Sequence, residues 1–337
     1  DATNGNLVWS ATYGSGTKDN CTGTPCTLSD MAYAIPADVT LVNRDFDQAG
    51  YIDRLYAADL GGNIWRVDLE PAGYNAAASA VGPSTWQITK FAALGGSGST
   101  PRKFFYPPDI VATKLFDMIL AGTGDREHPL YSSNTTQAYS IVNRFYGLKD
   151  LNTGSSVPLG WADAGSTPGM NAPIIDGTSS TADNAVTGLT TVTSSTTYNP
   201  ATANNGFYFT FPNAGEKAVN APTTVGGFTY IGTNAPQVPS SNACSTLGTA
   251  RGYQFNFLTG ASSFATFANG GLPPSPVAGL VNVMVNGADR LVPFCLGCGN
   301  PAGGGPDATS SIGGGRPPIP VPPVRKRVYW YLQNHDN

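Results

Sequence analysis

An acidic loop near the start of the chain has residue types and spacing suited to holding a divalent cation. Residues 41–55 read L-V-N-R-D-F-D-Q-A-G-Y-I-D-R-L. Within this stretch, Asp45, Asp47 and Asp53 occupy positions 1, 3 and 9 of a tight loop. Alternate residues of such a loop point inward, so these carboxylates converge, and Gly50 at position 6 allows the sharp bend. Hard oxygen ligands at this spacing favour Ca²⁺ over Mg²⁺, and the sequence therefore predicts a calcium site.

The loop departs from a complete EF-hand. Tyr51 at position 7 offers its backbone carbonyl, but Ala49 at position 5 supplies no side-chain oxygen, and Tyr56 stands where that motif has a bidentate Glu. Asn43 or a water molecule is expected to replace the missing ligand, and the affinity for calcium should fall toward about 10⁻⁴–10⁻³ M. The alternative is an acidic turn without an ion. It is disfavoured because three neighbouring carboxylates repel one another unless a cation lies between them.

The chain has five cysteines, and no His lies near any of them in the sequence. Cys21 and Cys26 close a short loop across a Gly/Pro turn, which suits a disulfide. Cys295 and Cys298 are candidates for a tighter one, and Cys244 is then left over. The alternative for the Cys295 pair is redox or metal chemistry, but its Gly/Pro-rich surroundings lack the strand-to-helix context of a thioredoxin-like motif. Structural disulfides are typical of exported proteins.

Catalytic motifs are missing from the sequence, which contains no Gly-x-Ser-x-Gly elbow, Walker loop or metal-binding His pair. Four ionisable residues, Asp125, Arg126, Glu127 and His128, crowd together after an apolar run. They are interpreted as a salt-bridged loop, with a catalytic cluster as the alternative. The protein is therefore expected not to be an enzyme.

Composition limits the classes of protein to which the chain can belong. It has 337 residues with a net charge of −4, which argues against a non-specific nucleic-acid binder. Charged residues make up only 12%, while 41 Gly and 27 Pro indicate a chain rich in turns. No apolar run is long enough for a transmembrane helix. The many Ser, Thr, Asn and Gly residues and few Lys residues fit an exported protein.

Short runs of aromatic and β-branched residues bounded by Gly, Pro and Asn predict an all-β fold. The clearest are residues 56–69, 118–121, 206–211, 228–231 and 327–332. A recurring phrase, Asp or Asn followed three residues later by Thr or Asn and then Gly, predicts one type of hairpin turn. The acidic or amide side chain bonds to backbone amides just ahead of it, and Gly takes a positive φ. The phrase occurs at residues 1–5, 150–154 and 256–260, with a shorter form at 59–62.

Repetition of one hairpin type predicts a β-propeller of four-stranded blades with long loop insertions. Ordinary hairpins in a β-sandwich are the alternative. We expect the propeller over residues 1–298, with a Thr/Ser-rich exposed insertion at about 177–205. A Gly/Pro-rich loop is expected at 299–323 and a closing strand and tail at 324–337.

Several segments, in order along the chain, resemble the PilY/PilC family of type IV pilus tip-associated adhesins and biogenesis factors. Each motif alone is weak, and their common order gives the resemblance its specificity. They are D-F-D-Q-A-G-Y-I-D-R-L-Y-A-A-D-L-G-G-N-I-W-R-V-D-L at 45–69, I-L-A-G-T-G at 119–124, G-F-Y-F-T-F…G-E-K-A-V-N at 206–220, F-T-Y-I-G-T-N-A-P at 228–236, and Cys244 followed by G-Y-Q-F-N-F-L-T-G at 252–260.

The resemblance implies a quinoprotein-like β-propeller, partial here, at the pilus tip or outer cell surface. It implies that Asp45, Asp47 and Asp53 bind Ca²⁺ with the Tyr51 carbonyl, and that this ion tunes pilus biogenesis, resistance to retraction and surface or host attachment. Ala49 falls where the family usually has Asp or Asn. Minor pilins, the pilus tip complex and an attachment target are the implied partners. Because this propeller begins further upstream in the family, the chain is expected to be the C-terminal part of a larger protein.

Two other functions remain open at this point. A quinoprotein-type dehydrogenase would use the same architecture, but the adjacent cysteine pair that such enzymes carry is missing from this sequence. A purely structural filament or surface component would also fit the low charge and the Thr/Ser-rich insertion.

Overall fold

The computed structural model describes residues 1, 3–43, 52, 54–69, 82–96, 102–113, 116–133, 138–150, 175–176, 188–202, 205–239, 246–267, 270–285, 288–298 and 314–315. Regular structure in this part of the chain is almost entirely β-strand, with one short 3₁₀ helix, η2 (Ala138–Ser140). The predicted all-β class is confirmed.

The first large sheet is built from four strands that follow one another along the chain. They are β4 (Thr40–Val42), β5 (Arg54–Ala58), β6 (Asn63–Asp68) and β7 (Gln87–Ala93), each antiparallel to its neighbour. Two short strands, β2 (Asn20–Thr22) and β11 (Ile175–Asp176), pair with the outer strand β7. Residues 56–69, expected to be extended, are therefore a hairpin of β5 and β6.

The second sheet repeats this order. Its strands are β8 (Asp109–Ala112), β9 (Asp117–Gly122), β10 (Arg144–Asp150) and β13 (Gly206–Thr210), again antiparallel. A fifth strand, β12 (Thr190–Val192), runs parallel to β13 at the sheet edge. Gly206 adopts a φ of +126°, and a Cβ there would lie 2.1 Å from the carbonyl oxygen of Gly147, so the close approach of β10 and β13 requires glycine.

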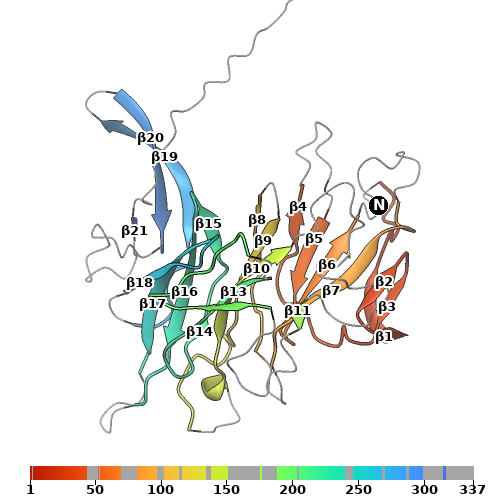
Figure 1. Ribbon diagram of the computed structural model, residues 1–337, viewed down its shortest axis with the longest axis horizontal. Helices are drawn as coiled ribbons and strands as arrows, with labels where there is room; N and C mark the ends of the chain where they lie inside the picture. Colours follow the sequence, from red (N-terminus) through yellow and green to blue (C-terminus); the bar gives the residue numbers. More distant parts are fainter. Residues whose placement is uncertain are drawn as a thin grey trace, which may run out of the picture.

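The third sheet consists of β16 (Phe228–Ala235), β17 (Thr249–Asn256) and β18 (Ser262–Thr266), preceded by a first strand in two pieces. These pieces, β14 (Lys217–Ala218) and β15 (Thr223–Val225), both pair antiparallel with β16. Three successive four-stranded antiparallel sheets therefore follow each other along the chain and lie in a row (Figure 1). This is the blade topology of a β-propeller, here in part.

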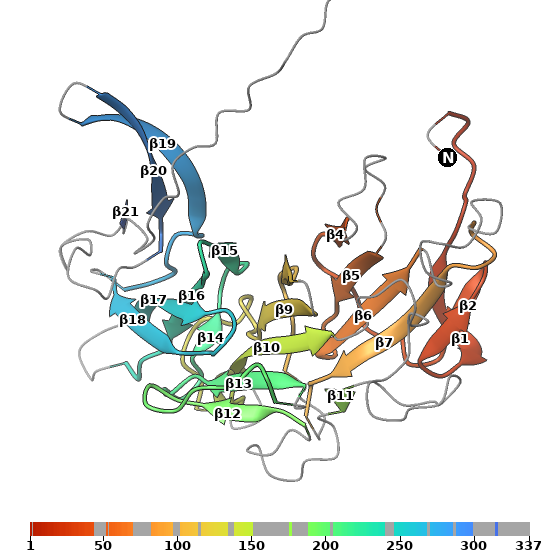
Figure 2. The ribbon, with the colours of Figure 1, turned by 45° about the horizontal axis from the view of Figure 1, so that its top comes forward.

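Smaller elements lie at the two ends of the row. The parallel pair β1 (Ala11–Thr17) and β3 (Cys26–Leu28) lies beside the first sheet. At the other end, β19 (Val277–Val285) and β20 (Ala288–Leu296) form a long hairpin that projects from the third sheet (Figure 2). A two-residue strand, β21 (Gly314–Gly315), pairs with the last two residues of β20 and falls within the predicted Gly/Pro-rich loop.

Two apolar cores hold the sheets face to face. The core between the first and second sheets includes Ile64, Phe91, Tyr146 and Leu148. The core between the second and third sheets is dominated by aromatic rings. Within it, Phe145 of β10 stacks on Phe255 of β17 with ring centroids 4.2 Å apart.

The predicted hairpin turns are confirmed at residues 59–62 and 256–260, which connect β5 to β6 and β17 to β18. The phrase at residues 1–5 also closes a turn, but no strand pair flanks it, since the first strand in the described part of the chain begins at Ala11. Asn256 Oδ1 accepts hydrogen bonds from the amides of Leu258 and Thr259, and Gly260 has a φ of +66°. Asp59 Oδ1 likewise accepts from the amides of Gly61 and Asn63 between β5 and β6. Each of these carboxylate or amide side chains organises its turn, as the recurring phrase predicts.

The Thr/Ser-rich segment 177–205 is not simply an exposed loop. Its described residues include β12, and Val192 and Tyr198 are both buried in the core between the second and third sheets. The expectation of a fully exposed insertion was wrong here because two apolar side chains suffice to dock a segment whose average composition is polar.

The predicted closing strand at 324–337 lies outside the described residues. The described part of the chain contains no helix of the length and hydropathy required to cross a bilayer.

Candidate functional site

The predicted calcium loop connects two paired strands. Val42, the last residue of β4, is the cross-strand partner of Arg54, the first residue of β5. The connecting segment 43–53 is therefore closed at its base, which holds the two ends of the acidic loop together. Asn43, the predicted extra ligand, lies at this base and is partly buried. The other predicted ligands lie outside the described residues: Asp45, Asp47, Tyr51 and Asp53.

Arg54, which directly follows the loop, reaches into a buried ionic cluster. Its Nε donates to Asp68 Oδ1 at 2.8 Å, and its Nη1 lies 3.3 Å from Asp117 Oδ2 and 3.3 Å from Asp150 Oδ2. The side chain of Arg54 is only 3% exposed. Because Asp117 and Asp150 belong to the second sheet, Arg54 joins the end of the acidic loop to the neighbouring sheet.

A second arginine and a tyrosine complete this cluster. Arg66 Nη1 donates to Asp150 Oδ2 at 2.7 Å, and Arg66 Nε donates to Asp68 Oδ2 at 3.1 Å. The hydroxyl of Tyr56 donates to Asp150 Oδ2 at 2.8 Å. Two cations thus face three carboxylates at the junction of the first and second sheets. We call Arg54, Tyr56, Arg66, Asp68, Asp117 and Asp150 the inter-sheet ionic cluster.

The two arginines compensate the charges of the buried carboxylates in the inter-sheet ionic cluster. Asp117 and Asp150 are directly opposite each other on β9 and β10, where two like charges destabilise a sheet unless a cation lies between them. Burial by itself would raise the pKa of Asp150, but Arg66 and Arg54 outweigh burial and hold that pKa below its ordinary value. Burial, reinforced by the charge of Asp150, raises the pKa of Tyr56 well above its usual range. The carboxyl of Asp150 is thus ionised and the phenol of Tyr56 neutral at pH 7.

Sequence reasoning missed this cluster. Its members are spread over four strands between residues 54 and 150, and only the pairing and packing of these strands brings them together. A usable signal was charge within otherwise apolar strands, as in the R-V-D that ends β6. Such a hydrogen-bonded network is almost wholly shielded from solvent, so it can lock two sheets together and relay a change at Arg54.

Both predicted disulfides are present. Cys21 and Cys26 are joined with their Cα atoms 5.8 Å apart, and Cys295 and Cys298 with theirs 5.6 Å apart. The bond between Cys295 and Cys298 lies against Tyr230 of the third sheet. Cys244 lies outside the described residues. The described chain contains no group of three His, Cys, Asp or Glu side chains arranged to hold a metal ion.

The cluster at residues 125–128 is a salt-bridged loop, as interpreted from the sequence. Asp125 Oδ2 lies 2.7 Å from Lys103 Nζ and 3.0 Å from His128 Nδ1. Burial alone would raise the pKa of Asp125, but the hydrogen bonds from Lys103 and His128 outweigh it and lower that pKa.

Lys217 lies beside this loop and is fully buried, with its Nζ donating to the carbonyl oxygen of His128 at 2.6 Å. Burial lowers its pKa to about 8, against the opposing influence of Asp125. Between pH 8 and the ordinary pKa of lysine, Lys217 is protonated more often in the unfolded chain than in the folded one. The free energy of unfolding therefore rises with pH over this range.

We therefore expect Lys217→Met to raise the free energy of unfolding at pH 7 by about 1–3 kcal/mol, because it removes a desolvated charge. The difference from the wild type should shrink as the pH rises from 8 to 10. Urea unfolding of the wild type and Lys217→Met at pH 7, 8 and 10 measures the difference in the free energy of unfolding. A difference that grows over this range would contradict the account.

Comparison with solved structures gives a loose structural likeness. No protein-family model matches the sequence, and no curated protein matches it. A solved structure that is similar to this chain is the C-terminal domain of PilY1 from Pseudomonas aeruginosa. The two are 18% identical with a TM-score of 0.44, and the match covers 76% of this chain and 57% of that one. At this level the likeness carries no argument about function, and the chain spans little more than half of the PilY1 domain. The fold assignment rests on the strand pairings above.

Proposed function

We propose that this chain is a calcium-binding, non-enzymatic factor of the type IV pilus tip, which supports pilus assembly, counteracts retraction and mediates attachment to a surface or host. The observation that carries the proposal is the closure of the acidic loop by the pairing of Val42 with Arg54. It confines the acidic segment that resembles the PilY/PilC calcium loop to a short hairpin connection. The order of motifs along the chain supplies the pilus assignment.

The ligand set follows from donor chemistry and position in the loop. Carboxylate oxygens at three positions and one backbone carbonyl are the hard ligands that calcium takes in proteins. In this arrangement the oxygen of the Asn43 side chain, at the base of the hairpin, takes the place left by Ala49. The residues that would hold the ion are Asp45, Asp47, Tyr51, Asp53 and Asn43.

The loop and the inter-sheet ionic cluster form one mechanical unit in this proposal. Calcium neutralises the loop carboxylates and fixes Asp53, whose neighbour Arg54 is bonded to Asp117 and Asp150 of the second sheet. Ordering the loop therefore favours one arrangement of the first two sheets over others. The surface presented to pilin partners or to an attachment target would then depend on the calcium concentration.

The proposal is tested in cells that carry the full-length protein with Asp53→Ala. We expect immunogold label at the pilus tips of wild-type cells, and fewer surface pili in the variant because retraction is no longer opposed. Asp38→Ala is the matched control, since Asp38 is exposed and outside the loop. Label spread along the filaments would indicate a structural subunit instead, and normal piliation in Asp53→Ala would contradict a role for the ion.

A further inference from the structure

The hairpin of β19 and β20 is incomplete as a sheet. Each of the three blades has four strands in order, whereas this hairpin has two long strands and a third of only two residues. Isolated two-stranded hairpins are marginally stable in water. Apolar side chains on it face solvent, with Val277 62% and Met284 75% exposed. The described residues leave the outer edge of β19 unpaired along its whole length.

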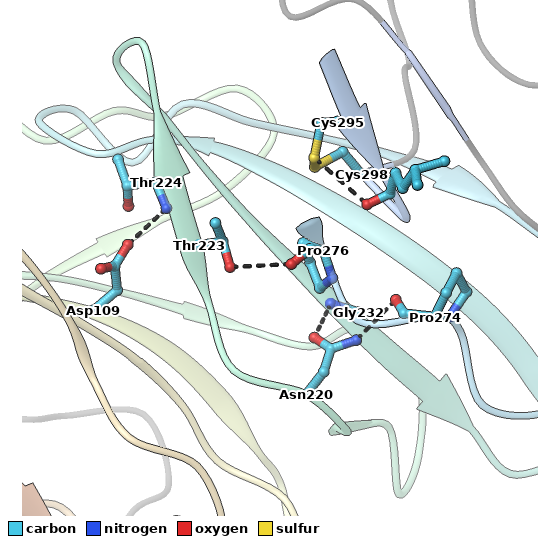
Figure 3. The surroundings of a disulfide bond; sticks show 10 residues. Asp109, Asn220, Thr223, Thr224, Gly232, Pro274, Pro276, Cys295 and Cys298 are labelled. Atoms are coloured by element: carbon cyan, nitrogen blue, oxygen red, sulfur yellow. Dashed lines mark hydrogen bonds between the residues drawn. A yellow bond between two sulfur atoms is a disulfide. The ribbon is translucent and has the colours of Figure 1, made fainter. Parts of the chain in front are cut away.

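The root of this hairpin is nevertheless firmly attached to the third sheet. Thr223 Oγ1 donates to the carbonyl oxygen of Pro276, and Asn220 Nδ2 donates to that of Pro274 (Figure 3). Asn220 Oδ1 in turn accepts from the amide of Gly232 in β16. The disulfide between Cys295 and Cys298 lies at the same end. The edge of β19 starts from this anchored root and contains no charged or proline residue, and such an unpaired edge is a template for another strand.

We propose that residues 328–332 of this same chain dock as an additional strand on the free edge of β19. Their sequence, V-Y-W-Y-L, is the strand pattern predicted nearest the C-terminus, and it lies outside the described residues. The edge of β20 is less suitable, because its root is already paired with β21 and its sequence contains Pro293. The nine residues of β19 contain no proline, so every amide on its free side can donate.

Chain length and charge agree with this placement. Strand β21 brings the chain to the root of the hairpin, and the segment from Gly315 to Arg327 spans up to about 40 Å when extended. A nine-residue strand is about 30 Å long, so the tail reaches any part of the edge. The basic residues 325–327 precede the docking strand, and exposed Asp289 lies one pair from the tip of the hairpin. Opposite charges there favour entry of the tail at the tip, followed by a strand antiparallel to β19.

Hydrogen exchange measured by mass spectrometry tests the proposal on the full chain and two truncations. Removal of residues 324–337 should make the β19 amides exchange at least about tenfold faster. Removal of residues 334–337, beyond the docking strand, should leave them unchanged. Slow exchange in β10 and β16 verifies that the truncated chain is folded. A synthetic peptide of residues 324–337 should restore slow exchange in the longer truncation, and the same peptide with Trp330→Pro should not.

Equal exchange of β19 in all three chains would overturn the proposal, as would a native peptide that restores nothing. Protection that appears only with concentration, together with a dimer mass by light scattering, would assign the edge to a second copy and also contradict it.

Discussion

Replacing Asp150 with alanine is expected to lower the free energy of unfolding by about 3–5 kcal/mol, the usual effect of removing one partner from a buried ion network. Asp150 accepts from Arg66 and Tyr56 and lies 3.3 Å from Arg54. Its loss leaves Arg66, which is fully buried, with one carboxylate partner fewer. Urea unfolding of the wild type and the variant at pH 7 measures the effect.

Asp38→Ala is the control for the loss of a carboxylate, and we expect it to change stability by less than about 0.5 kcal/mol because Asp38 is exposed. The double variant Asp150→Leu with Arg66→Met should be more stable than Asp150→Ala, since it removes both charges together. An Asp150→Ala protein as stable as the control would contradict the inter-sheet ionic cluster.

Acid should remove the same stabilisation. Burial raises the pKa of Asp150, but Arg66 and Arg54 outweigh burial and hold this pKa below its ordinary value. The stabilisation that the Asp150 carboxylate gives the folded protein is therefore complete above the ordinary pKa of Asp. It is lost as the pH falls through the lower pKa of the folded state. The difference in stability between the wild type and Asp150→Ala should thus be constant near neutrality and narrow below about pH 4.

The second large effect is expected on strand β10, at the face opposite to Asp150. Phe145→Ala should lower the free energy of unfolding by about 3–5 kcal/mol, the range for truncating a buried aromatic side chain. Phe145 is fully buried and stacks on Phe255 of the third sheet, and Phe207 lies beside it. The variant opens a cavity between the second and third sheets. Thermal or urea unfolding measures the loss.

Phe264→Ala provides the matched control for this substitution. Phe264 is on the edge strand β18 and is 49% exposed, so its truncation should cost clearly less than that of Phe145. Equal losses in the two variants would show that the aromatic core does not hold the two sheets together.

The turns of this protein could be predicted from its sequence because their causes are local. The Asp59 and Asn256 side chains bond to amides within four residues, and Gly62 and Gly260 take the positive φ that each turn requires. Strand identity was also predictable for β9, β13 and β16, whose aromatic and β-branched residues carry the signal.

The inter-sheet ionic cluster could not be predicted because its members are set by long-range pairing. Arg54 and Asp117 are far apart in the chain and meet only when the first two sheets pack. The β19–β20 hairpin is a different case. Its strands flank the dipeptide Asn286-Gly287, the strongest short-range hairpin signal, and this signal was overlooked.

The most direct test of the account is a calorimetric titration of the purified chain with calcium. We predict one ion per chain with a dissociation constant of about 10⁻⁴–10⁻³ M, abolished by Asp53→Ala and retained in Asp38→Ala. An absence of binding heat at millimolar calcium, or unchanged binding by Asp53→Ala, would contradict the assignment of the hairpin loop as a calcium site.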